Sequence, residues 1–492
     1  MKKYILILAA FFTAGISGCK KDYLSLENNP NTPSITTPQL TLAAALNATA
    51  SNIVTQYNYY GVWAGYWTTS GNYVPNSTIN QYQFTPTSFQ NDWTLWYENL
   101  ANYNNLQIQA SKDPSLLNYQ AIAMIMKAYG FEILVDNYND VPYSQAFDVT
   151  KNVFPAYDKG VDIYHDLGKQ LDAAIALMGK STATTVVPGA DDIVYGGNMA
   201  AWAAFANTLK LKLAVRVYKK LGVSDPLVTD LASTSAAGYI DGSANPEADV
   251  NPGYTNAAGK QNPFYADYGF DASGNATGNN VYFRANAFAV NMMTTFNDPR
   301  VDALYLPLSS GAVRGNGFGD PGVESNTFTS AIGAGLLKSP SQSEPIFTAA
   351  ESLFLQAEAV QNSLITSTST AKTLYQDGIT ASFTSLGLTD AQATTYYDQA
   401  INNVGWDASA NKEQAIITQK WIALDGYFNF EGYNEYRRTG YPVLKSSIDP
   451  AAISPTLPTR IPYPQSELTT NAGNLGKEGT INYFTSKIFW AQ

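Results

Sequence analysis

Apolar residues recur every three or four positions along much of the chain, which is the period of an α-helix that buries one face. The first such stretch follows Thr37, and its Leu42, Leu46 and Ile53 share one face. Threonine is favoured at a helix N-cap, and proline, here Pro38, fits the first helical position. The same period predicts further helices at about 88–103, 113–136, 158–178, 198–220, 284–296, 346–360, 371–378, 389–402 and 411–435.

Three stretches lack this period. Residues 61–85 are rich in aromatic and amide side chains, residues 239–345 are dense in glycine, proline, asparagine and serine, and residues 441–492 are mostly irregular. Long ordered loops in a compact domain often carry function. The pattern therefore predicts a mainly α fold of stacked helical pairs, with a large loop-rich insertion and an irregular C-terminal tail.

We expect a single domain over residues 37–492, because the helices on both sides of the insertion have the same pattern of apolar and polar positions. Its parts are the N-terminal helices (37–238), the insertion (239–345), the C-terminal helices (346–440) and the tail (441–492). Ala371, Tyr375 and Gly378 have the spacing of the second helix of a tetratricopeptide unit. No clean repeat of about 34 residues is visible elsewhere, so any repeat is divergent.

The N-terminus is organised like a bacterial export signal. Lys2 and Lys3 precede a short apolar run, which is too short to span a bilayer as a resident helix. The next residues, Ile16-Ser17-Gly18-Cys19, resemble a lipobox, in which cleavage precedes the cysteine and its thiol receives a diacylglyceryl group. Cys19 is the only cysteine in the chain. We therefore predict a signal peptide over residues 1–18, lipidation at Cys19 and a flexible tether over residues 19–36. An ordinary secretory signal is the alternative.

Composition narrows the class of ligand. Without residues 1–18 the chain keeps 27 basic and 40 acidic side chains, a net charge of −13. Such a chain is a poor binder of nucleic acid, because phosphate neutralisation supplies most of that affinity. The 33 tyrosines and 8 tryptophans suit recognition of neutral polar ligands such as sugars or peptides. Tyrosine-rich composition is also common among bacterial surface proteins, which leaves both interpretations open.

Candidates for catalysis are few. A nucleophilic triad would need His165, the only histidine, which falls on the polar flank of its predicted helix without a nucleophile elbow nearby. A carboxylate pair for glycoside hydrolysis would include Asp136 and Asp140 first, because the separation of such a pair is set by the fold. Both also stand where turn-forming aspartate is expected.

One stretch resembles a calcium loop. Asp241, Ser243, Asn245, Glu247 and Asp249 alternate as in an EF-hand. A proline occupies the position that needs glycine, however, and another replaces the bidentate glutamate. No cofactor is predicted; a structural Ca²⁺ in another geometry and a solvated turn remain alternatives here.

Two strings near the C-terminus carry a family resemblance. Residues 419–424 (QKWIAL) and 431–442 (EGYNEYRRTGYP) describe a helix with Trp421 buried and a second helix that ends in Arg437 and Arg438, where cations favour the helix dipole. Together they closely resemble the C-terminal signature of the SusD/RagB family of nutrient-binding outer-membrane lipoproteins of Bacteroidetes. Further segments agree in order: 136–146, 192–197 with Trp202, 207–212, 297–300, 357–359 and 463–467.

The sequence differs from the family's pattern at three positions. Tyr433 stands where a tryptophan is expected, Asn139 replaces a glycine, and Arg460 is single where the family often has a basic pair. None of these touches a reaction, since the family is not enzymatic.

The resemblance implies both a fold and a role. Members of this family form tetratricopeptide-like helical superhelices with an irregular ligand region. They are anchored to the outer membrane at the cell surface and pair with a SusC-like TonB-dependent barrel. The lipoprotein acts as a hinged lid that delivers glycans or peptides to the pore. We expect the same of this chain.

The ligand-binding residues are not set by a family motif, so we choose them from the aperiodic stretches. Rings there can stack on a sugar face or an apolar side chain, and neighbouring asparagines can donate and accept hydrogen bonds. The candidate rings are Tyr66, Trp67, Tyr73, Tyr82, Tyr254, Phe264, Tyr265, Tyr268 and Phe270, and the candidate amides are Asn72, Asn76 and Asn262. For each one, local loop packing is the alternative.

Two other functions remain open. A surface glycoside hydrolase would turn glycans over, whereas a pure scaffold would hold the transporter complex without binding any glycan or peptide.

Overall fold

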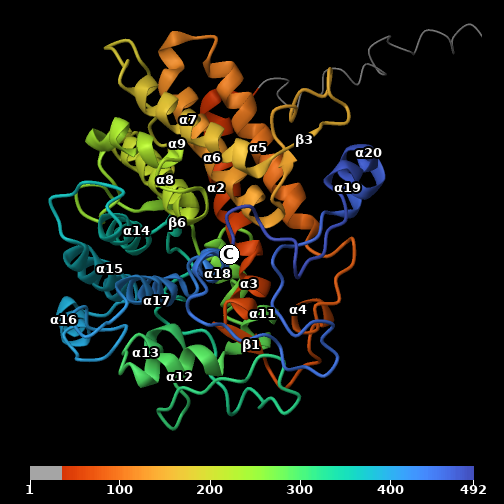
Figure 1. Ribbon diagram of the computed structural model, residues 1–492, viewed down its shortest axis with the longest axis vertical. Coiled ribbons are helices and arrows are strands. Elements are labelled where there is room, and N and C mark those ends of the chain that lie inside the picture. The colour runs from red at the N-terminus through yellow and green to blue at the C-terminus, as the bar shows by residue number, and fades with distance from the viewer. Residues whose placement is uncertain (1–35) are drawn as a thin grey trace, which may run out of the picture.

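Helices dominate the computed structural model, which describes residues 36–492 (Figure 1). The predicted signal peptide, Cys19 and the tether as far as residue 35 lie outside the described residues. Consecutive long helices contact one another, so the predicted mainly α fold of helical pairs is confirmed. The N-terminal helices are α2 (Pro38–Thr55), α5 (Gln90–Ala110), α6 (Leu117–Tyr138), α7 (Gly160–Met178) and α8 (Met199–Leu221). The later helices are α14 (Ala349–Gln361), α15 (Ala371–Ser385), α16 (Asp390–Tyr397), α17 (Lys412–Leu424) and α18 (Asn429–Thr439).

Side-chain caps explain where these helices begin. The Thr37 hydroxyl accepts a hydrogen bond from the Leu40 amide, and Asn198 caps α8 in the same way. The predicted bounds change in two places. A short 3-10 turn, η2 (Pro114–Leu116), precedes α6, and the helical pattern over 411–435 is two helices, because Gly426 turns the chain with φ +77°.

The stretch 61–85 contains regular structure that its sequence pattern does not show. It includes the end of α3 (Tyr57–Trp63), strand β1 (Trp67–Thr69) and α4 (Ser77–Asn80). All of residues 61–70 are buried, which removes the contrast between polar and apolar faces. Strand β1 pairs antiparallel with β5 (Phe283–Ala285), more than two hundred residues later in the chain. A strand with such a distant partner has no local signal.

The predicted insertion also holds more structure than the single expected helix. The chain forms α10 (Pro263–Tyr268), α11 (Gly278–Tyr282), α12 (Ala287–Thr295) and α13 (Val301–Leu304), and β4 (Ala248–Val250) pairs with β6 (Glu344–Phe347). Phe264 of α10 packs on Tyr57 of α3, so this region is part of the core. The division of one domain into four parts stays a prediction. Shorter elements complete the chain: β2 (Val141–Pro142), β3 (Tyr157–Asp158), α9 (Pro226–Thr229), η3 (Asp230–Ala237), α19 (Gln465–Thr470), α20 (Ala472–Leu475) and η4 (Gly476–Glu478).

The segments that carry the family resemblance meet in a buried network of charges. On α8, Lys212 Nζ lies 3.1 Å from Glu132 and 2.9 Å from Glu431, and Arg216 lies 2.7 Å from Asp136. All five side chains are buried. Burial by itself would raise the pKa of Glu431, but Arg216 and Lys212 reverse this and lower it to about 2. The network therefore joins α6, α8 and α18 by ion pairs that water does not screen.

Arg438, in the last turn of α18, belongs to a second buried cluster of charges. Its guanidinium is buried and bonds to both oxygens of Glu358 at 2.7 Å and to Glu435 at 2.5 Å. Lys420 of α17 approaches Glu435 at 2.9 Å. The predicted placement of Arg437 and Arg438 in the last turn of a helix is confirmed, and the charge of Arg438 is balanced there by carboxylates on two helices.

Asp92 should make the stability of the fold depend on pH. Its buried carboxylate on α5 accepts a hydrogen bond from the Tyr59 hydroxyl at 2.8 Å. Burial raises the pKa of Asp92 to about 7, although hydrogen bonds from Tyr59 and Thr55 lower it. The folded protein thus keeps a proton that the unfolded chain releases above about pH 4, so the free energy of unfolding should fall as pH rises from about 4 to about 7.

The measurement compares Asp92→Asn with the parent protein by urea unfolding across this pH range. The variant should lose a pH-dependent component of about 4 kcal/mol. Asp407→Asn, at a carboxylate that is largely exposed, is the matched control. An unchanged pH slope in Asp92→Asn would contradict the assignment.

Candidate functional site

Most of the predicted ligand-binding rings are inside the protein. The Tyr66 hydroxyl donates to the Trp421 carbonyl at 2.6 Å, and the Trp67 ring lies 5.0 Å from that of Tyr268. A side chain without exposed surface cannot contact a ligand in this structure. We therefore leave the buried candidates, six rings and one asparagine, out of the candidate site. Those at most 9% exposed are Tyr66, Trp67, Tyr82, Tyr254, Asn262, Phe264 and Tyr268.

Two of the predicted asparagines begin helices. The Asn76 side chain accepts a hydrogen bond from the Ile79 amide at the start of α4, and Asn262 does the same at the start of α10. Asn262 also donates to Glu344 at 2.8 Å. Both side chains therefore have a structural task as N-caps.

Two other predicted residues, which are neighbours in the sequence, lie at the surface. Asn72 and Tyr73 are exposed, Tyr73 by 42%, in the loop between β1 and α4. The half-buried Tyr282 at the end of α11 lies beside them, with its ring centroid 5.7 Å from that of Tyr73. The Tyr282 hydroxyl accepts a hydrogen bond from the Asn76 amide at 3.0 Å. Two rings from distant segments thus form a joint surface.

Hydrogen bonds hold this surface in place. The Asn326 amide donates to Asn72 Oδ1 at 2.8 Å, and Arg284 Nε donates to Asn326 Oδ1 at 2.7 Å. Burial lowers the pKa of Arg284, and the neighbouring Tyr73 opposes this. We call Asn72, Tyr73, Tyr282, Arg284 and Asn326 the loop aromatic site.

Sequence reasoning missed Tyr282, Arg284 and Asn326. All three lie in the predicted insertion, where many polar and aromatic residues look alike. The antiparallel pairing of β1 with β5 carries Tyr282 and Arg284 to Tyr73. The available signal was the order Tyr282-Phe283-Arg284. Neighbouring residues of a strand point to opposite faces, so in a strand Tyr282 and Arg284 share one face and Phe283 takes the other.

A second pair of rings is partly exposed. Tyr265 on α10 is half-buried and Phe270 is 36% exposed, with ring centroids 6.1 Å apart. Asn279 on α11 donates to Asp267 on α10 at 3.0 Å, so the helices that carry Tyr265 and Tyr282 are joined directly. Both predicted residues remain candidates for ligand contact.

The carboxylates suspected of catalysis are structural. Asp136 accepts a hydrogen bond from Trp490 Nε1 at 2.7 Å and forms an ion pair with Arg216. Asp140 accepts a hydrogen bond from the Gly160 amide at 2.8 Å and forms an ion pair with Lys159 at 2.8 Å. One group of three carboxylates, Glu132, Asp136 and Glu431, is close enough to hold a metal ion. Lys212 and Arg216 already supply the positive charge there.

The calcium-like stretch is a turn that leads into β4. One oxygen of Asp241 accepts from the backbone amides of Ser243 and Asn245, and Glu247 accepts from the Ala349 amide at 2.8 Å. These bonds account for the alternation without an ion. Beside the turn, α14 and α15 form a groove of about 980 Å³ that carries five carboxylates. None of the described residues that line it is aromatic, so it offers no ring for stacking.

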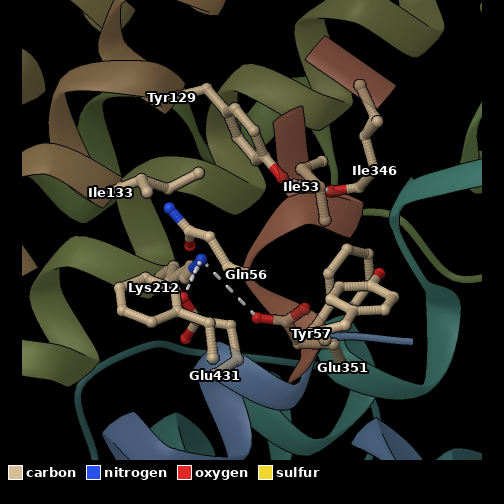
Figure 2. A pocket seen from close by; sticks show the side chains of 11 residues that line it. Ile53, Gln56, Tyr57, Tyr129, Ile133, Lys212, Ile346, Glu351 and Glu431 are labelled. Carbon is tan, nitrogen blue, oxygen red and sulfur yellow. Dashed lines mark hydrogen bonds and ion pairs between the residues drawn. The ribbon is translucent and has the colours of Figure 1, made fainter. Parts of the chain in front are cut away.

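The enclosed cavity in Figure 2 is too small for a nutrient. Its volume is about 20 Å³, room for about one water molecule, and Gln56, Lys212 and Glu351 provide polar atoms around it. Figure 2 shows Lys212 between Glu351 and Glu431. The cavity thus belongs to the buried charge network.

Comparisons with known proteins agree with this architecture. Residues 30–464 match the model of the SusD-like family described as "Starch-binding associating with outer membrane". A search of curated proteins found no match. Over residues 36–492, we find no helix with the length and apolar character that a bilayer crossing requires.

Solved structures show the same fold. A chitin-binding SusD homologue from Flavobacterium johnsoniae is 24% identical with a TM-score of 0.73, over 91% of this chain and 98% of its own. A SusD-like protein from Bacteroides thetaiotaomicron VPI-5482 is 21% identical with a TM-score of 0.73, over 91% and 98%. A SusD homologue from Bacteroides uniformis ATCC 8492 is 22% identical with a TM-score of 0.72, over 92% and 99%. The chain therefore belongs to the SusD-like family, a family of outer-membrane-associated nutrient-binding proteins.

Proposed function

We propose that this chain is a cell-surface lipoprotein that captures glycans at the loop aromatic site and delivers them to a SusC-like TonB-dependent transporter. The observation that carries the proposal is the exposed pair of Tyr73 and Tyr282 rings beside Asn72 and Asn326. Glycans are favoured over peptides because the family model is described as starch-binding and a structural relative as chitin-binding.

The chemistry of the site supports a neutral polar ligand. Sugar rings present apolar C–H faces to aromatic rings, and their hydroxyl groups exchange hydrogen bonds with amide and guanidinium groups. Tyr73 and Tyr282 supply the rings, Asn72 and Asn326 supply the polar groups, and the buried Arg284 holds Asn326 in place. No acid–base pair is needed for capture, and the two carboxylates suspected of catalysis are engaged elsewhere.

The lipid anchor is the second part of the proposal. Acylation of Cys19 would fix the N-terminus to the outer membrane, and more than one acyl chain gives stable anchoring. The 17 residue steps from Cys19 to Thr36 span about 55–60 Å at full extension. This reach would let the folded part act as a lid over a transporter.

Incubation of the mature protein with starch and chitin oligosaccharides tests the proposed activity. Calorimetry measures binding, and chromatography of the same mixtures measures turnover. We expect binding with no new saccharide products. New products would contradict the proposal and favour a glycoside hydrolase. A lack of binding to glycans and peptides, together with co-purification of a barrel protein, would contradict it in favour of a scaffold.

A further inference from the structure

A second pocket lies between α5, α6 and α7, away from the elements of the loop aromatic site. Its volume is about 230 Å³, and the segment 143–147 after β2 forms part of its wall. That is somewhat below the range of drug-sized pockets, and it suits a ligand about as large as one monosaccharide. We call it the amide pocket. Its defining polar residues are Asn104, Gln107, Lys127 and Gln170.

Lys127 is a cation with only neutral hydrogen-bond partners. Its Nζ donates to Asn104 Oδ1 at 2.8 Å and to Gln107 Oε1 at 3.0 Å. Among the described residues, no carboxylate oxygen lies within the 4.0 Å of an ion pair with it. An ammonium group has three N–H donors, so one remains for a ligand.

The acidic group that acts on Lys127 already has hydrogen-bond donors. Asp166 of α7 acts on Lys127 through space, but its Oδ2 accepts hydrogen bonds from the Tyr143 hydroxyl at 2.5 Å and from Gln170 at 3.4 Å. Burial lowers the pKa of Lys127 to about 8, and Asp166 only partly opposes this. A negative charge brought into the pocket would stabilise the ammonium form.

Aromatic rings complete the lining of the pocket. Phe147 has φ +66°, which bulky residues rarely adopt, and its ring packs 6.1 Å from Phe131 and 6.3 Å from Tyr97. Phe131 and Phe147 both line the pocket. The lining thus combines apolar rings with amides and a cation that has no ion-pair partner among the described residues.

We propose that the amide pocket binds a small hydroxylated carboxylate, such as a sugar acid, through the Lys127 ammonium. The carboxylate takes the free N–H of Lys127. The hydroxyl groups bond to the amides of Asn104, Gln107 and Gln170, and the C–H face of the ligand packs on the phenylalanine rings. This site is independent of the proposed glycan capture.

Titration of the mature protein with D-glucuronate, followed by NMR or calorimetry, tests the site, with D-glucose as the neutral probe. We expect glucuronate to bind about tenfold more tightly than glucose, and Lys127→Met to weaken it about tenfold or more. Lys338→Met is the matched control, because burial also lowers the pKa of this lysine, which faces Glu247 and Asp249 instead. Thermal unfolding verifies that both variants fold.

A pH series on the unmodified protein gives a second readout that needs no variant. Affinity for glucuronate should fall about tenfold from pH 7 to pH 9, as Lys127 loses its proton while Tyr143, whose pKa burial raises, stays neutral. The proposal is overturned if glucuronate does not bind at millimolar concentration, or if Lys127→Met binds it as the parent does. Loss of binding in Tyr73→Ala but not in Lys127→Met would also overturn it.

Discussion

Arg438→Met should lower the free energy of unfolding by about 3–5 kcal/mol, because it leaves the buried carboxylate of Glu358 without a cation and that of Glu435 with only one. Glu358 would lose both of its 2.7 Å bonds to the guanidinium, and Glu435 would keep only Lys420. The side chain of Arg438 is 1% exposed and that of Glu358 is fully buried, so water cannot replace the lost bonds. Methionine is flexible and fills much of the same space, which keeps the packing loss small. Urea or guanidinium unfolding measures the effect.

Lys372→Met is the matched control for this substitution. Lys372 also pairs with a carboxylate, Asp407 at 2.6 Å, but both side chains are exposed, by 42% and 80%. Exposed pairs contribute about 0–1 kcal/mol, so this variant should unfold almost as the parent protein does. If Arg438→Met cost no more than Lys372→Met, the ion pairs of Arg438 would not stabilise the contact between α14, α17 and α18.

Helices were the most predictable part of the fold. The 3.6-residue period of apolar positions and the capping side chains are both local, so Thr37 and Asn198 mark the starts of α2 and α8 in the sequence itself. The break between α17 and α18 was visible only in part, because the apolar period over 411–435 reads as one helix. The dipeptide Asp425-Gly426 is nevertheless a local turn signal, and the strings 419–424 and 431–442 describe two helices.

The loop aromatic site could be predicted only in part from the sequence. Tyr66, Trp67 and Tyr73 lie within eight residues of one another, and the sequence offers no reason to separate them. The structure buries Tyr66 and Trp67 because α17, α10 and β5 cover them, and these elements follow much later in the chain. Tyr73 lies beyond β1 and stays exposed. Exposure is thus decided by long-range contacts, which a local pattern does not contain.

The family signature was identified from sequence, but its physical meaning came from the structure. The sequence places Glu431, Glu435 and Arg438 on one charged helix, but a single sequence does not show which charges face each other. In the fold they meet Lys212, Arg216 and Glu358 from two other helices. A charged motif of this kind therefore identifies the fold, and the binding surface must be found elsewhere.

The most direct test of the account is the affinity of the mature protein for chitin and starch hexasaccharides before and after removal of the two exposed rings. Each ring should contribute about 1–2 kcal/mol, so the double variant Tyr73→Ala/Tyr282→Ala should bind about 30-fold more weakly or worse. Phe154→Ala is the matched control, because that ring is 62% exposed in a different loop. Its affinity should equal that of the parent protein.

The account predicts that calorimetry finds binding by the parent and by Phe154→Ala, strong weakening in the double variant, and the same thermal unfolding in all three. Affinity of the double variant within about twofold of the parent would contradict it.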